Sequence, residues 1–283
     1  DYNVPEPYGA FMYQVTQKNG ARCSAAKAYL TPNMDRPNLT VVTGALTRRV
    51  LLDGRGATGA LASIGGQDVT ITARREVILS AGAFGSPQIL QLSGIGSGAM
   101  LRSRGIGLVH ELPGVGENLQ DHIDYVYTYR TGADTDTFGI SVRGGYRIAK
   151  GIGLWRRQRK GILTTPYAES GAFFRSGPDA EIPDLQLVFV QAIVDDHGRR
   201  PHWGHGISCH VTLLRPKSRG TVTLETADAS DAPRIDTAFF SEPDDMRVLL
   251  KGADLQRRIL DGQAFDEVRG KALYALDQSD PRA

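Results

Sequence analysis

The chain has 283 residues, and 33 Lys and Arg against 31 Asp and Glu give it a formal net charge of +2 at pH 7. So small a charge gives no reason to expect nucleic acid as a partner. Hydrophobic residues at 41% and charged residues at 23% are ordinary for a globular protein of one large domain or two. No apolar run approaches the length of about 18 residues that a membrane span needs. The two cysteines, Cys23 and Cys209, are far apart, which favours reduced thiols over a disulfide scaffold.

The first part of the chain contains short elements joined by glycine turns. We expect an amphipathic piece over 24–30 and a short strand over 38–43. Three strand-like runs follow near 46–53, 57–64 and 67–74, and the glycines between them predict an antiparallel meander. Gly54–Gly59 spells GxGxxG, but no helix follows it, so we interpret these glycines as tight turns and not as a dinucleotide fingerprint.

The stretch Gly82–Gly96, GAFGSPQILQLSGIG, is the most informative in the chain. The apolar run just before it predicts a buried, parallel strand over 76–80. Ser86 is a candidate N-cap residue with Pro87 at the first helical position, and Ser93–Gly96 ends the predicted helix. A strand, a turn of small residues and a helix N-terminus allow backbone to approach a phosphate or a flat cofactor closely.

The second half of the chain predicts an antiparallel sheet. Tyr125, Tyr127 and Tyr129 alternate as on a half-buried strand, and 151–161 indicates a short helix. Further strands are expected at 172–175, 184–194, 206–214 and 221–226, with no long helices between them. A helix should begin at Ser241, with Pro243 in its first turn and an apolar stripe made of Met246, Leu249, Leu250, Ala253 and Leu260. The predicted fold class is therefore α/β or α+β.

Residues 82–96 resemble the second signature of the glucose–methanol–choline (GMC) family of flavin-dependent alcohol oxidoreductases, and they fill every constrained position of that signature. The likeness is strongest to the choline dehydrogenase-like bacterial branch. Other segments also resemble the family, in family order: 19–30, 38–53, 112–122, 166–176 and 213–224.

The resemblance implies two kinds of domain. Residues 1–122 would form part of an FAD-binding domain with a β-meander, although 1–18 could instead belong to the substrate domain. Residues 123–240 would form a substrate-binding domain with an antiparallel sheet, and 241–283 a helical return towards the FAD domain. The family's dinucleotide fingerprint is expected before residue 1 and its active-site histidine after residue 283. We therefore expect an internal piece of a flavoenzyme, with no catalytic residue of its own.

The resemblance also implies cofactor contacts, with FAD as the cofactor of the full-length parent and weak or absent binding by this piece. The residues concerned are Thr47, Ala81, Gly82, Ala83, Asn118, Asp121 and His122. Simpler roles remain open for them. Thr47 could be a plain strand residue, and Asn118 and Asp121 could serve only as turn-making and capping residues.

Glu169 is the most interesting carboxylate, because choline-type members place a glutamate in about this segment of the substrate wall. Tyr167 and Phe173 could add cation–π contact to a trimethylammonium group. An exposed glutamate with no such role is the alternative. His210 could face the substrate cavity or be a satisfied core histidine. No metal site is predicted at His202–His210, because glycines interrupt the run and no cysteine or carboxylate pair completes it.

The implied function is FAD-dependent oxidation of a primary alcohol, choline-like or another short alcohol, to an aldehyde by the parent enzyme. The chain itself would be an inactive fragment, a stand-alone binding or scaffold module, or one part of a split enzyme. Truncation would expose apolar surface, which predicts self-association, or disorder around 1–45. The resemblance is compatible with a bacterial cytoplasmic location and with peripheral association with a membrane.

Overall fold

The computed structural model describes residues 3–132 and 136–274, which form two compact units. The first, here called the sheet unit, contains 1–33, 122–215 and 244–283; the second, the meander unit, contains 34–121 and 216–243. Among the described residues, 3–33 and 244–274 group with the antiparallel sheet. The last nine residues of the predicted C-terminal part, 275–283, lie outside the described residues. The assignment of flavin and substrate domains stays a prediction.

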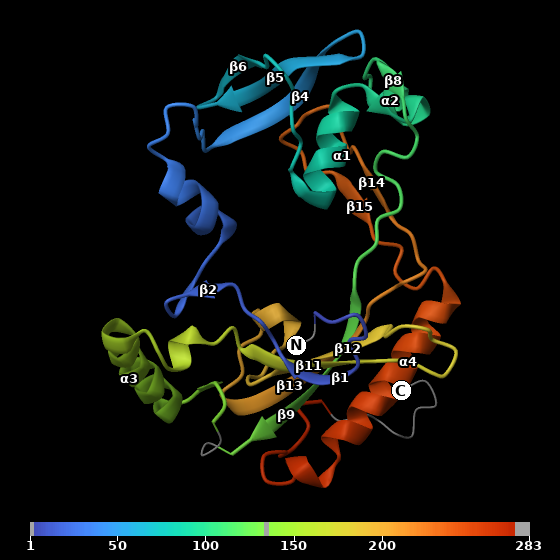
Figure 1. Cartoon of the computed structure of the whole chain (residues 1–283). Helices are drawn as coiled ribbons and strands as arrows, with labels where there is room; N and C mark the ends of the chain where they lie inside the picture. Colours follow the sequence, from blue (N-terminus) through green and yellow to red (C-terminus); the bar gives the residue numbers. More distant parts are fainter. Residues whose placement is uncertain (1–2, 133–135, 275–283) are drawn as a thin grey trace. The chain divides into compact units, whose positions relative to one another are not determined.

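The sheet unit is built on a six-stranded antiparallel sheet, which confirms the predicted architecture (Figure 1). Its strands run in the order β1 (Gly9–Met12), β11 (Ala168–Phe174), β12 (Leu185–Val190), β13 (Gly204–Leu213) and β9 (Ile123–Thr131), and β10 (Gly139–Ile140) also pairs with β13. Tyr127 and Tyr129 are buried on β9, but Thr128 between them is buried as well, so the predicted half-buried alternation holds only in part. Residues 9–12 lie in the segment for which the sequence predicts association or disorder, yet they form β1.

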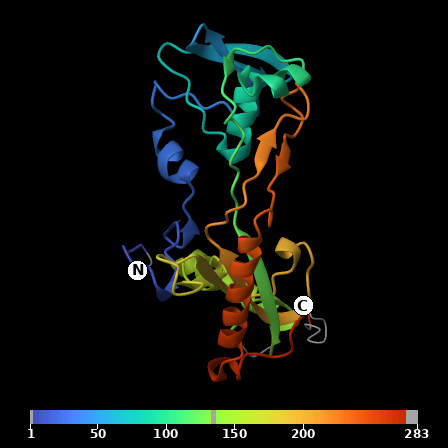
Figure 2. The same cartoon turned by 90° about the vertical axis from the view of Figure 1, so that its right-hand side faces the viewer.

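Helix α4 (Pro243–Leu260) covers one face of this sheet (Figures 1 and 2). A Cβ added to Gly252 would lie 2.8 Å from Val211 Cγ2, so helix and sheet are in close contact. The predicted apolar stripe is only partly right: Leu249 and Leu260 are buried, whereas Met246 and Leu250 are exposed. The buried face is completed by Gly252 and by Gln256, whose Nε2 donates a 2.5 Å hydrogen bond to the Cys209 carbonyl.

Helix α3 (Val142–Gln158) starts nine residues before the predicted helix at 151–161. The sequence prediction was wrong about the start of this helix because its N-cap residue, Ser141, lies outside the run 151–161 from which the helix was predicted. Ser141 Oγ accepts a 2.9 Å hydrogen bond from the Gly144 N–H. Short elements complete the unit: β2 (Gln17–Lys18), β3 (Ala21–Arg22), η1 (Ala26–Leu30), η2 (Thr31–Asn33), η3 (Ile162–Thr164), η4 (Asp196–Gly198) and η5 (Gln263–Phe265).

The meander unit contains the predicted three-stranded antiparallel sheet of β4 (Ala45–Asp53), β5 (Gly56–Ile64) and β6 (Gln67–Thr72). Gly54 and Arg55 form the turn between β4 and β5, which confirms that the GxGxxG run is not a strand–helix fingerprint. A Cβ at Gly59 would lie 2.2 Å from the Ile71 carbonyl oxygen, so this glycine permits close strand contact. The strand expected over 38–43 was wrong, because these residues form no ladder.

The rest of the meander unit contains α1 (Gly82–Leu92), β7 (Ile95–Gly96), α2 (Gly98–Ser103), β8 (His110–Glu111), β14 (Thr221–Thr223) and β15 (Arg234–Asp236). The buried parallel strand predicted at 76–80 is wrong: Ile78 is 75% exposed, and no strand within the described ranges pairs with this segment. An apolar run becomes a parallel strand only where neighbouring strands satisfy its backbone. Helix α1 begins at Gly82, so Ser86 is not its N-cap; Ser86 Oγ instead accepts a 3.1 Å hydrogen bond from the Ala81 N–H.

Candidate functional site

A hollow of about 410 Å³ lies at the N-terminal part of α1 in the meander unit. Two of the predicted cofactor residues, Ala83 and Asn118, line it. The other lining residues are Pro87, Gly116, Glu117, Leu119, Gln120 and Val222. The structure thus brings together a residue of the 82–96 signature and a residue of the NLQDH string, which are 35 positions apart in the sequence.

The walls of the hollow are fixed by Gln91, a fully buried residue of α1. Its Nε2 donates to the Val115 carbonyl at 3.1 Å and to the Val222 carbonyl at 2.9 Å. Gly116 allows the loop to lie against β14, since an added Cβ would be 2.1 Å from the Val222 oxygen. Sequence reasoning missed Val222 because β14 is remote in the chain. In the sequence, the glycines at 114 and 116 were the only local signal of this hollow.

The backbone at the start of α1 suits an anionic or flat group. Gly82 has a φ of +79°, and no atom lies within 4 Å of the position of an added Cβ. The first N–H groups of a helix lack intrahelical acceptors, and together with the helix dipole they favour negative charge nearby. The start of α1 therefore offers backbone N–H groups and open space to the phosphate-bearing or adenosine portion of a dinucleotide cofactor, and Glu117 is the one charged residue in the lining of the hollow.

The remaining predicted cofactor residues are not in the lining of this hollow. Ala81 occupies the N-cap position of α1. Thr47 lies on β4 opposite Ala62, directly before a register irregularity. Asp121 falls in the meander unit and His122 in the sheet unit, so the predicted set is divided between the two units. The roles of these residues as cofactor contacts stay predictions.

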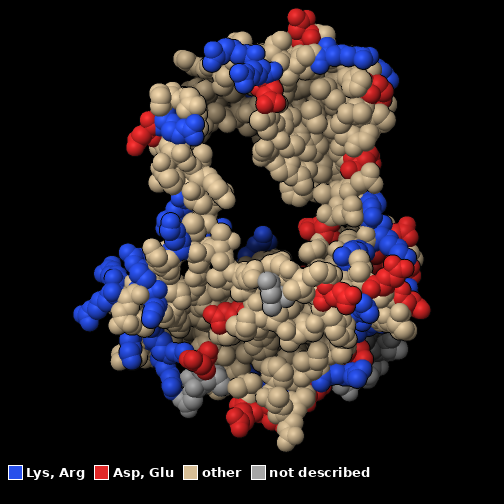
Figure 3. Space-filling model, viewed as in Figure 1, with Lys and Arg blue, Asp and Glu red and all other residues tan. Residues whose placement is uncertain are grey.

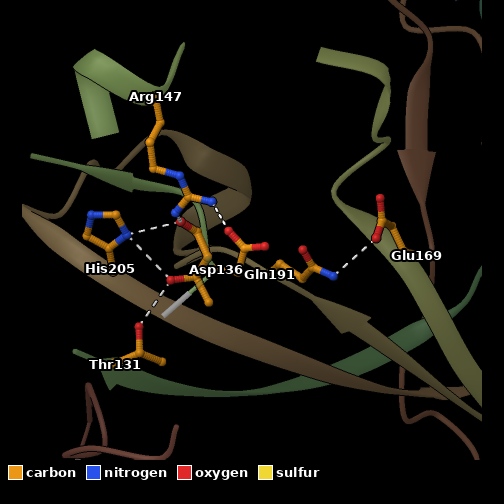
Figure 4. A network of polar contacts seen from close by, with 7 residues as sticks. Thr131, Asp136, Arg147, Glu169, Gln191 and His205 are labelled. Carbon is orange, nitrogen blue, oxygen red and sulfur yellow. Dashed lines mark hydrogen bonds and ion pairs between the residues drawn. The ribbon is translucent and has the colours of Figure 1, made fainter. Parts of the chain in front are cut away.

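Glu169 is the bulged residue of β11, because the register of this strand against β12 shifts between Ala168 and Ser170. Its Oε2 accepts a 3.1 Å hydrogen bond from Gln191 Nε2, as Figure 4 shows. The Gln191 backbone N–H donates to the Tyr167 carbonyl at 3.2 Å, which links the predicted carboxylate to the predicted tyrosine.

Tyr167 is half exposed and has a φ of +67°, which is unusual for a non-glycine residue. Its ring contacts Phe138, with centroids 4.5 Å apart. Phe173, the other aromatic residue considered for cation–π contact, packs on Phe11 with centroids 4.9 Å apart. Phe138 was missed by sequence reasoning because it precedes the short strand β10, more than 20 positions before Tyr167.

His205 is a satisfied core residue, and Figure 4 shows it within a polar network of the sheet unit. Its Nδ1 lies 3.0 Å from the Thr137 carbonyl, which can only accept, so Nδ1 carries the proton. Nε2 then accepts from the Ser141 hydroxyl at 2.8 Å. Because Ser141 also caps α3, His205 anchors the start of that helix.

The other two histidines of the 202–210 run are paired with aspartates. His202 Nε2 lies 2.6 Å from Asp195 Oδ2, which also accepts a 2.5 Å hydrogen bond from the Tyr274 hydroxyl. Hydrogen bonds from Tyr274 and His202 hold the pKa of Asp195 below its ordinary value. Across 3–132 and 136–274, no group of three or more His, Cys, Asp or Glu side chains is arranged to hold a metal ion.

His210 lies on β13, on the face opposite α4, because its neighbours Cys209 and Val211 contact that helix. Its Nδ1 is 2.6 Å from Asp124 Oδ2. This hydrogen bond from His210 holds the pKa of Asp124 below its ordinary value, and it outweighs the opposing effect of burial. His210 is thus held in a fixed orientation on the sheet face.

Comparison with known proteins identifies the family. Two models described as GMC oxidoreductase match residues 1–124 and 216–283. An alcohol dehydrogenase (acceptor) of Pseudomonas putida is 41% identical over 267 residues, covering 94% of this chain and 48% of the relative. An oxygen-dependent choline dehydrogenase of Photobacterium profundum is 38% identical over 275 residues, covering 96% and 48%.

Solved structures of formate oxidase share the fold. One overlaps with a TM-score of 0.86 at 25% identity, covering 97% of this chain and 52% of that chain. Another, an Aspergillus oryzae formate oxidase studied for FAD modification, gives a TM-score of 0.83 at 24% identity, covering 95% and 52%. The chain belongs to the GMC oxidoreductase family, and it spans about half the length of the curated relatives it matches.

Within residues 3–132 and 136–274, none of the helices combines the length and the apolar character that a membrane span requires.

Proposed function

We propose that the enzyme to which these residues belong oxidises a primary alcohol to an aldehyde with FAD as its cofactor. The observation that carries this proposal is the hollow at the start of α1, formed in a GMC family chain by residues of the signature and of the NLQDH string. When bound, FAD supplies an acceptor for the hydride that leaves the alcohol carbon.

In this proposal the backbone N–H groups of Gly82 and Ala83, with the helix dipole, hold the phosphate-bearing part of the cofactor. Ala81 lies beside it, with its own N–H donated to Ser86 Oγ. Asn118 borders the same hollow and contributes polar contacts. Thr47, Asp121 and His122 are proposed as further cofactor contacts on the strength of the family resemblance alone.

None of these residues is proposed as the general base. His202, His205 and His210 are each engaged, by Asp195, by Ser141 with Thr137, and by Asp124. On the strength of the family resemblance we assign the 283 residues a binding role and expect no alcohol oxidation from them alone. The second candidate is a scaffold module or one part of a split enzyme. In a split enzyme, partner chains would supply the base.

Binding of FAD by the purified chain tests the role of the hollow. Ala83→Glu puts a carboxylate in the first turn of α1, where it repels the cofactor phosphates yet suits the helix dipole. Ala99→Glu is the matched control, in the first turn of α2 and outside the hollow. In a titration followed by flavin fluorescence and visible absorbance, we expect weak binding that Ala83→Glu reduces about tenfold or more. Equal binding by both variants, or no binding by the wild type with excess FAD, would contradict the proposal.

For the substrate, we propose a choline-like alcohol whose trimethylammonium group lies beside Glu169 and Tyr167. The bulge presents the carboxylate of Glu169, Gln191 orients it, and the rings of Tyr167 and Phe138 supply cation–π contact. His210 is proposed as a further wall residue, fixed by Asp124.

Calorimetry with choline and with its neutral isostere 3,3-dimethylbutan-1-ol tests the charge recognition. Glu169→Gln should weaken choline binding and leave the neutral alcohol unchanged. Equal effects on both ligands would exclude Glu169 as the recognition group.

A further inference from the structure

The sheet unit carries a local excess of positive charge that the proposed alcohol oxidation does not use. Between Thr137 and Ala168 the sequence contains no Asp or Glu, but it contains seven basic residues: Arg143, Arg147, Lys150, Arg156, Arg157, Arg159 and Lys160. Residues 7–34 likewise hold Lys18, Arg22 and Lys27 and no acid. Figure 3 shows Lys and Arg gathered over α3, although the net charge of the whole chain is only +2.

The two basic segments are joined at the C-terminal end of α3. Trp155 Nε1 donates a 2.6 Å hydrogen bond to the Gly20 carbonyl, and a Cβ at Gly20 would lie 2.1 Å from the Arg159 oxygen. The turn between β2 and β3 is therefore fastened to this helix end. The Arg159 guanidinium lies over the Trp155 ring at 4.2 Å from its centroid, which holds the cation in place.

This junction borders an open hollow of about 1020 Å³, and every charged residue that lines the hollow is basic. Lys18 and Lys27 come from the first segment, and Arg159 and Lys160 from the second. Four cations around one hollow favour a ligand with negatively charged oxygens, of which phosphate groups are the commonest in a cell.

Helix α3 adds apolar side chains beside these charges. Its inward stripe consists of Gly144, Gly151 and the half-buried Arg147 and Trp155. On the opposite side Val142 and Tyr146 are 85% and 69% exposed, with Ala149 and Gly153 on the same stripe. Arg156 and Arg157 flank this stripe, one on each side. An apolar strip bordered by basic residues is the arrangement of helices that lie in the interface of a membrane.

We infer that the outward face of α3 binds the surface of a bilayer that contains anionic phospholipids, and that the cations of the basic hollow at its C-terminal end add to the positive potential that attracts it. The basic residues attract the lipid phosphates, and Val142 and Tyr146 enter the headgroup layer. A nucleic acid would satisfy the charges but would leave the aliphatic Val142 exposed to water, so the lipid surface is the better complement.

Vesicle co-sedimentation of the whole chain tests this. Vesicles of phosphatidylcholine mixed with phosphatidylglycerol should retain the chain, vesicles of phosphatidylcholine alone should not, and added salt should release it. Arg156→Gln with Arg157→Gln should weaken partitioning about tenfold or more, since each surface cation contributes about 1 kcal/mol at an anionic membrane. Arg74→Gln with Arg75→Gln is the matched control, with the same loss of charge on exposed residues of the meander unit.

A second variant separates insertion from charge attraction. Val142→Ser with Tyr146→Ser keeps every basic residue, and it should weaken binding at high salt more than at low salt. Circular dichroism checks that α3 is intact in each variant. Equal loss of binding in the Arg74 and Arg75 control, equal retention by neutral vesicles, or full competition by millimolar glycerol phosphate would overturn the inference. Binding of duplex DNA without binding of anionic vesicles would also overturn it.

Discussion

Single hydrogen bonds in this chain determine where its ionisable side chains point. His205 and His210 lie on the same strand, five residues apart, and therefore on opposite faces. His205 is buried and serves the cap of α3, whereas His210 is half-buried and paired with Asp124. The sequence left both readings open for His210, because a strand pattern fixes the face of a residue but not its partner on the neighbouring strand.

The pair formed by Asp124 and His210 predicts a pH effect on stability. Because the pKa of Asp124 is lowered in the folded state, its ionised form stabilises the fold at pH values above the ordinary value of 3.8. This contribution is lost as the pH falls below 3.8 through the lowered pKa. Urea unfolding should therefore show that Asp124→Asn costs stability near neutral pH and progressively less in acid. Asp35→Asn, at an exposed position, is the control and should follow the wild type. A cost that is independent of pH would contradict the prediction.

At the scale of elements, the sequence predicted what depends on local patterns. Glycine turns marked the meander and the alternating tyrosines marked β9. The helix predicted to begin at Ser241 is α4, which begins two residues later, at Pro243. The failures needed tertiary information. The run at 76–80 has the composition of a buried strand but no partner strand in the described ranges, and Ser86 resembles a cap although α1 begins at Gly82. The hollow beside α1 needs β14, whose Val222 no local pattern connects to the signature.

Helix α3 offers a matched test of packing against intrinsic helix preference. Gly151 is buried, and an added Cβ would lie 2.4 Å from Ile162 Cγ2, whereas Gly153 is exposed and has no atom within 4 Å of that position. Gly153→Ala should stabilise the chain by about 0.5–1 kcal/mol because alanine is the better helix former. Gly151→Ala should destabilise it by about 1–2 kcal/mol because the overlap outweighs that gain. Thermal unfolding of both variants gives the comparison; stabilisation by both would show that Ile162 moves aside freely.

For the whole molecule, the distribution of apolar surface matters more than its total. Single exposed apolar residues are normal in globular proteins, but several on one unit provide apolar area for contact with other surfaces. In the meander unit Val42, Leu46 and Ile78 are 51%, 42% and 75% exposed, and the strand β6 exposes Ile71. Sequence composition could not locate this surface, because its apolar runs are also those expected of a protein core.

This exposed surface predicts that the chain associates with itself at high concentration. Burial of about 25 cal/mol per Å² of apolar area would stabilise such contacts without any specific partner. Light scattering after size-exclusion chromatography should give a mass above that of the monomer, rising with concentration. Ile78→Lys with Val42→Lys should return the mass to that of the monomer, because charge at an apolar contact opposes association. Ile182→Lys changes one exposed apolar residue of the sheet unit and should leave the association unchanged. A monomeric wild type at every concentration, or equal effects of both changes, would place the association elsewhere or exclude it.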